Sequence, residues 1–280
     1  MSLPFSTKQI IAIVTAAIII GASGLAASEF LGEAGMAVPI ALATVVLLLF
    51  VLESRDHQHR LFLRTLQEQR STYTQLEALL HVIRATDPVA PLPPMRSWAA
   101  SPDLLRELVS RILAERPREV VEASSGVSTI VIAYCLKRLG GGMVRSLEHE
   151  PVYAARTRQL IAEHGLEAFA DVIDAPLVSS RTGNAELRWY DLSKAALPSS
   201  IDLLVVDGPP DTSGPQARYP ALPLLKDRLV PGALVVLDDG ARADERAIAR
   251  RWTELVPGAE LRYIELEAGA WMLRMPGPRV

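Results

Sequence analysis

Two long apolar runs stand near the start of the chain. Residues 10–27 and 36–52 carry no charged side chain, and each just reaches the roughly 20 residues that a helix needs to cross a membrane. The connection between them contains two acids and no Lys or Arg, whereas Lys8 precedes the first run and Arg55 follows the second. The positive-inside rule then places both termini in the cytoplasm. We therefore expect residues 1–52 to form a transmembrane helical hairpin in the inner membrane, with a buried hairpin of a soluble protein as the alternative.

Residues 53–86 become polar but keep a helical pattern. Apolar residues recur there at alternating steps of three and four, the spacing of a coiled-coil seam, over about three heptads. One interpretation is a short parallel coiled coil that joins two copies of the chain through residues 59–84; the other is a stalk helix that lies on the domain after it. The seam positions are Phe62, Leu66, Tyr73, Leu76, Leu80 and Ile83, with Gln69 as the polar member.

The chain changes character again after residue 86. Closely spaced prolines in TDPVAPLPPM mark residues 87–96 as an extended linker. From residue 97 to 280, helical patterns such as SPDLLRELVSRILAE alternate with short apolar runs: VVEA, MVRSLE, ADVID, IDLLVVD and ALVVLDD. Such alternation predicts an α/β fold, a Rossmann-like doubly wound and mostly parallel sheet. The closing ELRYIELEAGAWMLRM predicts an antiparallel hairpin, which completes seven strands.

Composition and motifs exclude several classes of function. The net charge of -3 and the pI near 6.0 provide no basic face for nucleic acid. The single cysteine, Cys135, rules out an intramolecular disulfide and a thiolate-cluster zinc site, and its apolar surroundings predict a buried core residue. The chain also lacks HExxH, a P-loop and GxSxG.

Acids follow most of the predicted strands. Glu122, Glu148 and Asp207 each stand at a strand end, and Asp238 with Asp239 ends another. In an open parallel sheet, ligands bind beyond the carboxyl ends of the strands. We therefore expect these carboxylates to converge on one ligand site.

This arrangement makes residues 96–275 resemble the class I S-adenosylmethionine-dependent methyltransferases. The family's first motif is an acid followed by small residues and glycines; here serines replace two of its three glycines. An acid after the second strand accepts the ribose hydroxyls in that family, a position that falls on Glu148, with Glu150 as a competing candidate. The resemblance implies S-adenosylmethionine as the cofactor, bound by Glu122, Ser124, Ser125, Gly126, Ser128, Glu148, His149, Asp174, Ala175 and Asp207.

The resemblance places Asp207 beside the methyl group, and the residues around it suggest further roles as hypotheses. Asp207 and Asp239 would orient or deprotonate the methyl acceptor, with Asp238 nearby. Arg218 and Arg242 would offer positive charge to an anionic acceptor, or else form an internal ion-pair network. Further candidates for contact with the acceptor are Trp189 and Tyr190, for which core packing is the alternative, and Tyr219. Trp98 stands where a lid could form.

Four stretches, WYDL, VDGPP, ARYPALPLL and VLDDGARADER, resemble a bacterial subgroup distantly like the catechol-type O-methyltransferases. Those enzymes hold a divalent metal with an Asp after strand four and an Asp-Asn pair after strand five. Asp207 and Asp239 match, but Gly240 replaces the Asn, and Pro209 and Pro210 stand where a lysine base is expected. Magnesium could still bind through oxygen ligands, but we expect no resident metal.

The sequence thus predicts a membrane-anchored methyltransferase, most simply an O-methyltransferase, acting at the cytoplasmic face on a small-molecule or lipid-linked acceptor. An NAD(P)-dependent oxidoreductase is one alternative, although the GxGxxG turn that pyrophosphate requires is missing. A non-catalytic membrane scaffold that keeps the fold is the other.

Overall fold

A computed structural model describes residues 7–32, 37–96, 99–182 and 185–277. The chain divides into two compact units, residues 1–70 and 71–280. The first contains helix α1 (Thr7–Leu31) and the beginning of helix α2 (Ala37–Thr86). Among the described residues, no helix is both long enough and apolar enough to span a membrane. The transmembrane hairpin stays a prediction, and Met36 of its second span lies outside the described residues.

The end of α2 packs on the second unit through one face. Ala78 and Val82 are fully buried, and the Gln75 side-chain oxygen accepts the backbone N–H of Asp103 at 3.1 Å. Residues 71–86 thus lie on the domain that follows them, as one of the two interpretations predicted. The predicted seam positions in this stretch are exposed: Tyr73, Leu76, Leu80 and Ile83.

The predicted linker is extended but lies against the same unit. The backbone N–H of Val89 donates to the Tyr134 hydroxyl at 3.0 Å, and Leu92 and Met95 pack against the hydrophobic core. Residues 87–96 are therefore part of the second unit.

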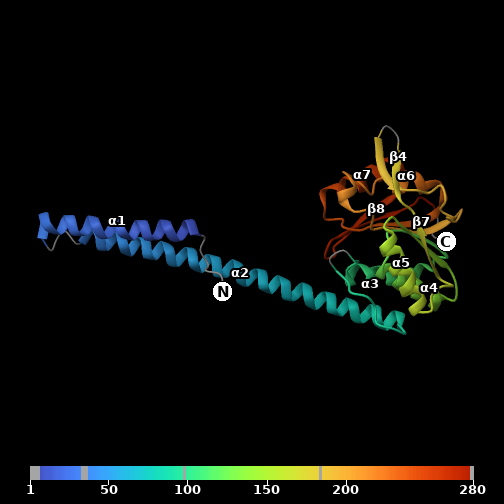
Figure 1. The fold of residues 1–280 in the computed structure, drawn as a ribbon, viewed down its shortest axis with the longest axis horizontal. Coiled ribbons are helices and arrows are strands. Elements are labelled where there is room, and N and C mark those ends of the chain that lie inside the picture. Colours follow the sequence, from blue (N-terminus) through green and yellow to red (C-terminus); the bar gives the residue numbers. More distant parts are fainter. Residues whose placement is uncertain (1–6, 33–36, 97–98, 183–184, 278–280) are drawn as a thin grey trace. The chain divides into compact units, whose positions relative to one another are not determined.

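A seven-stranded sheet forms the centre of the second unit (Figure 1), in the order β3-β2-β1-β6-β7-β9-β8. The first five strands in this order are parallel, and β9 pairs antiparallel with both β7 and β8. This confirms the predicted Rossmann-like sheet with its antiparallel C-terminal hairpin. The strands are β1 (Glu119–Ala123), β2 (Met143–Glu148), β3 (Ala170–Asp174), β6 (Ile201–Val206), β7 (Leu229–Leu237), β8 (Glu260–Ile264) and β9 (Ala270–Arg274).

Helices cover both faces of the sheet. Alternate residues of β1 point to opposite sides, as the two-residue repeat of a strand requires: Val120 packs in one core cluster and Val121 in the other. The first cluster includes α3 (Pro102–Glu115), α4 (Val127–Leu139) and α5 (Pro151–Glu163); the second includes α6 (Ala221–Leu225) and α7 (Ala243–Leu255). Short 3-10 helices cover Asp211–Ser213 and Lys226–Arg228. Cys135 is buried in the first cluster as predicted, and burial raises the pKa of its thiol to about 12.

A separate two-stranded antiparallel ribbon was not predicted. Strands β4 (Leu177–Thr182) and β5 (Ala185–Tyr190) pair with each other and with no strand of the main sheet. The ribbon, drawn in yellow-green to yellow in Figure 1, carries mostly polar residues, so no apolar run marked it. Its end brings Trp189 and Tyr190 into the second core cluster.

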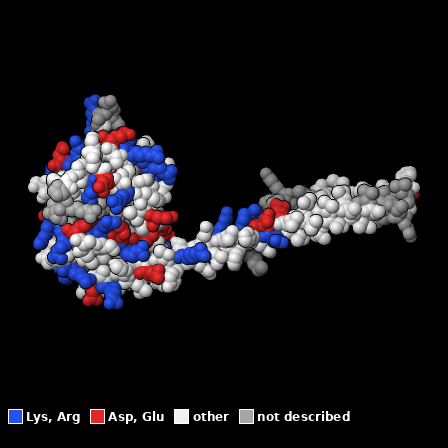
Figure 2. Space-filling model, turned by 180° about the vertical axis from the view of Figure 1, so that it is seen from behind, with Lys and Arg blue, Asp and Glu red and all other residues white. Residues whose placement is uncertain are grey.

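Positive and negative side chains are interspersed over the second unit. Figure 2 shows Lys and Arg beside Asp and Glu on the side drawn, with no extended surface of one sign. This distribution agrees with the net charge of -3.

Candidate active site

A cavity of about 550 Å³ lies at the carboxyl ends of β1, β2, β6 and β7. The structure brings together many of the residues that the sequence predicted: Ser124, Ser125, Glu148, His149, Tyr190, Asp207, Arg218, Asp238, Asp239 and Arg242. Its lining also includes residues to which the sequence gave no role or only a competing one: Ala99, Glu150, Tyr153, Gly208, Pro210, Asp211 and Thr212. Trp98 lies outside the described residues.

The turn between β1 and α4 forms one wall of the cavity. Ser124 has φ 109°, a conformation that favours glycine and costs a residue with a side chain about 1–3 kcal/mol. Its backbone N–H donates to the Leu147 carbonyl at 3.0 Å, which fixes the turn against β2. The turn continues through Gly126 into α4, whose first residue is Val127, so the N-terminus of that helix starts beside the cavity.

Glu122 lies beneath this turn and not on the cavity wall. The side chain is fully buried, and one carboxylate oxygen accepts the hydroxyls of Thr129 and Ser146, each at 2.6 Å. Burial raises the pKa of Glu122. Among the described residues, its other oxygen has no hydrogen-bond partner. Glu122 thus supports the turn from below, whereas Glu148 and Asp207 line the cavity; its role in binding the cofactor stays a prediction.

Glu148 reaches the cavity from the end of β2 and is held from several directions. Its Oε1 accepts the backbone N–H groups of His149 at 2.9 Å and Glu150 at 3.0 Å, and its Oε2 accepts the Ser125 hydroxyl at 2.8 Å. Ser125 also lies 3.1 Å from the Thr157 hydroxyl. The carboxylate is thus fixed at the cavity wall, where its oxygens can accept further O–H donors.

Arg218 sits in the middle of the strand-end acids. Its Nη2 lies 2.8 Å from Asp239 Oδ2 and 3.4 Å from Asp207 Oδ1, and its Nη1 donates to the Asp238 carbonyl at 3.1 Å. Glu245 of α7 lies 3.9 Å from its Nε. Arg218 is 4% exposed. The ion-pair network that was one interpretation of Arg218 is therefore what the structure shows.

Burial shifts the pKa values in this cluster. It raises the pKa of Asp207 to about 6, against the attraction of Arg218 and with the repulsion of Asp239. It also raises the pKa of Asp238 well above the ordinary value, with Asp207 and Asp239 adding to the shift. Burial alone would lower the pKa of Arg218, but the surrounding carboxylates raise it above its usual value. Arg218 therefore stays charged.

Tyr190 brings a hydroxyl without a partner to the same cavity. The residue is 2% exposed, and its hydroxyl forms no hydrogen bond with any described residue. Its ring stacks edge-on against His149 and Trp189, with centroid distances of 5.9 and 5.0 Å. A buried hydroxyl of this kind costs free energy unless a ligand satisfies it.

Several predicted site residues do not line the cavity. Trp189 is fully buried in the core, and Tyr219 packs beneath the Arg251 guanidinium at 3.5 Å. The Asp174 side chain turns outward to an ion pair with Arg158 at 2.8 Å. The predicted site residues that do not line the cavity are Glu122, Gly126, Ser128, Asp174, Ala175, Trp189 and Tyr219. Most of them are buried in the core or point to solvent.

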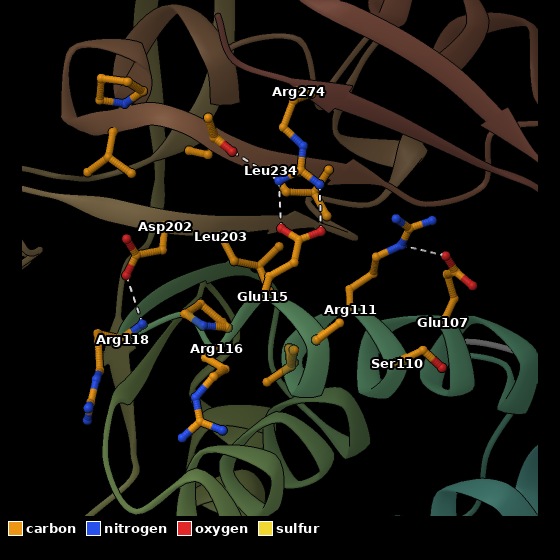
Figure 3. A pocket seen from close by; sticks show the side chains of 17 residues that line it. Glu107, Ser110, Arg111, Glu115, Arg116, Arg118, Asp202, Leu203, Leu234 and Arg274 are labelled. Atoms are coloured by element: carbon orange, nitrogen blue, oxygen red, sulfur yellow. Dashed lines mark hydrogen bonds and ion pairs between the residues drawn. The ribbon is translucent and has the colours of Figure 1, made fainter. Parts of the chain in front are cut away.

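A second cavity, of about 620 Å³, lies at the opposite edge of the sheet (Figure 3). Charged side chains in its lining form ion pairs with one another. Arg274 donates two hydrogen bonds of 2.6 Å to Glu115, and Arg111 donates one of 2.8 Å to Glu107. Asp202 accepts the backbone N–H of Arg118 at 2.8 Å. Because this cavity borders the amino ends of the strands, it is not where an open parallel sheet binds its ligand.

Comparisons with known proteins bear on the family and on the fold. Residues 123–240 match a family model described as a methyltransferase domain. Among solved structures, the SAH-bound methyltransferase PaMTH1 of Podospora anserina aligns over 75% of this chain and 95% of its own, with 14% identity and a TM-score of 0.53. The O-methyltransferase TomG of Streptomyces achromogenes, in complex with SAM, aligns over 72% and 89%, with 17% identity and a TM-score of 0.48. No curated protein sequence matches the chain. A methyltransferase-domain model thus matches residues 123–240, and the Podospora anserina structure agrees with the predicted fold.

Proposed function

We propose that this chain, whose residues 123–240 match a methyltransferase-domain model, is a class I methyltransferase that binds S-adenosylmethionine in the 550 Å³ cavity and methylates an oxygen of its acceptor. One observation carries the proposal: the Ser124–Ser125 turn, Glu148, Tyr190 and Asp207 all line a single cavity at the carboxyl ends of the strands. This is the edge at which open parallel sheets bind ligands.

The cavity residues suit the cofactor. When bound, S-adenosylmethionine supplies an electrophilic methyl group on a sulfonium. Glu148 has two acceptor oxygens for the neighbouring hydroxyls of a ribose, and its hydrogen bonds with Ser125 and the following backbone hold it in place. The start of α4 offers backbone N–H groups to a carboxylate. The Tyr190 hydroxyl, which has no partner among the described residues, is free to bond a ligand.

Asp207 suits the role of general base. A base works best when its pKa lies near the working pH, and burial raises that of Asp207 to about 6. At neutral pH the carboxylate is mostly ionised, so that it can take the proton of an acceptor hydroxyl while the oxygen takes the methyl group. Arg218 holds one oxygen of this carboxylate at 3.4 Å, which orients the side chain.

Incubation with methyl-labelled S-adenosylmethionine tests the proposal. Purified protein and extracts of the producing cells should yield a labelled product, and extracts from cells without the gene should accumulate the unlabelled acceptor. We expect the Asp207→Asn variant to bind the cofactor and to form product at least about 100-fold more slowly. Product formation by Asp207→Asn at the wild-type rate would remove Asp207 from the mechanism.

We further propose that residues 1–52 hold the enzyme at the cytoplasmic face of a membrane, where it meets a small-molecule or lipid-linked acceptor. Support comes from the uncharged runs 10–27 and 36–52 and from the flanking charges. In addition, Ile19, Leu25 and Leu48 are 62%, 71% and 57% exposed. Apolar surface of this kind is unfavourable in water and is stabilised by lipid or a partner.

We also propose that two copies of the chain associate through the exposed edge of α2. Tyr73, Leu76, Leu80 and Ile83 are spaced by three and four residues and are all more than two-fifths exposed. This spacing fits a second copy of the same helix in a short parallel coiled coil.

A further inference from the structure

Three acidic side chains at the ends of β6 and β7 stand as they would around a metal ion. Carboxylate oxygens of Asp207, Asp238 and Asp239 all lie within 4.8 Å of one another. The distant resemblance to the catechol-type enzymes implies a divalent cation at this place. The side chains around the cluster, however, already provide a positive charge there.

We propose that the buried guanidinium of Arg218 takes the place of that divalent cation, so that the transferase works without a resident metal. This inference rests on the proposed function, because it concerns how the same cavity is organised. Arg218 is a positioning residue: it neutralises the carboxylates and fixes the direction of Asp207.

The first argument is that carboxylate oxygens which could bind a metal already form ion pairs with arginine side chains. Asp239 Oδ2 lies 2.8 Å from Arg218 Nη2 and 2.9 Å from Arg242 Nη1, so that one oxygen serves two guanidinium groups. Asp207 Oδ1 lies 3.4 Å from the same Arg218 nitrogen. Magnesium binds carboxylate oxygens at about 2.1 Å in a nearly ideal octahedron. An ion bound through these same oxygens would have to displace Arg218.

The second argument concerns the missing ligand. Gly240 stands where the metal-dependent enzymes have asparagine. A Cβ atom at this position would lie 2.9 Å from Trp271 Cδ1 and 3.0 Å from the backbone of Ala270. Because the Trp271 ring is held by a hydrogen bond from its Nε1 to the Gly240 carbonyl at 2.9 Å, it cannot easily move away. The local packing thus excludes a side-chain ligand at residue 240.

The third argument is charge. Arg218 is 4% exposed, and a buried charge requires compensation by opposite charges. Asp207, Asp239 and Glu245 surround it, at 3.4, 2.8 and 3.9 Å. A divalent cation added beside the guanidinium would place like charges together in a site of low dielectric, where repulsion is strong. The guanidinium and the ion therefore compete for the same place.

Manganese binding tests the inference with a readout other than catalysis. The full-length protein is titrated with Mn²⁺, and the signal of the free ion is followed by electron paramagnetic resonance. We expect the wild-type protein to show no stoichiometric site. Arg218→Met, which removes the charged guanidinium and keeps an unbranched apolar side chain, should bind one Mn²⁺ per chain at least about tenfold more tightly than wild type. The double variant Arg218→Met/Asp239→Asn should lose this gain.

The matched control is Arg262→Met. Arg262 also lies near an acid, Glu260, at 3.6 Å, but its side chain is 71% exposed, so this change should leave Mn²⁺ binding at the wild-type level. One stoichiometric Mn²⁺ on the wild-type protein that disappears in Asp239→Asn would overturn the inference. A folded Arg218→Met that gains no Mn²⁺ affinity would overturn it as well. The wild-type titration decides the matter even if Arg218→Met does not fold.

A titration with S-adenosylmethionine on the same preparation separates this inference from the proposed function. Failure of the wild-type protein to bind the cofactor contradicts the proposed function. Cofactor binding together with a stoichiometric Mn²⁺ site contradicts only the role of Arg218.

Discussion

Among single residues of the cavity, Ser124 and Asp239 adopt backbone conformations that favour glycine, with φ 109° and 57°. Strain of this kind is typical of sites where the surrounding structure fixes a functional geometry. Ser124 was recognisable from the sequence as a serine at a glycine position of the family motif. Its strain was not, because φ depends on how the turn meets β2, where its N–H bonds to Leu147.

Substitution of Ser124 by glycine should stabilise the protein. Because glycine adopts the positive φ without strain, Ser124→Gly is expected to raise the free energy of unfolding by about 1 kcal/mol. Ser125→Gly is the matched control, since it removes the hydroxyl that bonds Glu148 and Thr157 and should lower stability. Thermal unfolding of the two variants measures both effects; a loss of stability in Ser124→Gly would contradict the assigned strain.

The pKa of Asp207 gives the reaction a predictable pH dependence. Because burial raises this pKa to about 6, the base is protonated and inactive below that pH and ionised above it. The value of kcat/KM, which reports the free enzyme, should therefore rise as the pH increases through about 6 and then level off. Asp207→Asn should lower the rate by about 100-fold or more. If kcat/KM of the wild-type protein stayed constant from about pH 5 to about pH 7, Asp207 would not be the base.

At the level of elements, most of the main sheet could be predicted because its strands are apolar runs that end in acids. The ribbon of β4 and β5 could not, because its polar strands give no such run. The Gly183-Asn184 dipeptide is a common hairpin sequence, and it could have indicated a turn between two strands. The predicted linker 87–96 packs on the domain because Leu92 and Met95 lie among its prolines.

Helix α2 shows why a heptad pattern alone cannot identify the partner of a helix. Val82 is fully buried against the second unit, whereas Leu80 is 60% exposed. We expect Val82→Asp to lower the free energy of unfolding by about 2 kcal/mol or more, because it buries a charge without a partner.

Leu80→Asp should leave stability nearly unchanged and convert a dimer to a monomer in light scattering. A wild-type protein that is monomeric at all concentrations would end the coiled-coil proposal.

For the whole molecule, the location and the chemistry can be tested separately. Full-length protein should remain in the membrane pellet after carbonate extraction, because residues 10–27 and 36–52 are free of charge. A variant that lacks residues 1–52 should move to the supernatant and still bind S-adenosylmethionine. Recovery of the full-length protein in the supernatant would contradict the membrane proposal and leave the methyltransferase proposal intact.

The measurement that tests the central claim most directly is calorimetric titration of the full-length protein with S-adenosylmethionine and, separately, with NAD. We predict one S-adenosylmethionine per chain and no NAD. Glu148→Gln should weaken cofactor binding by about tenfold or more, whereas Glu150→Gln, one of the cavity residues but 55% exposed in its side chain, should change it little. Absence of S-adenosylmethionine binding to the wild-type protein, or unchanged affinity in Glu148→Gln, would contradict the assignment of this cavity.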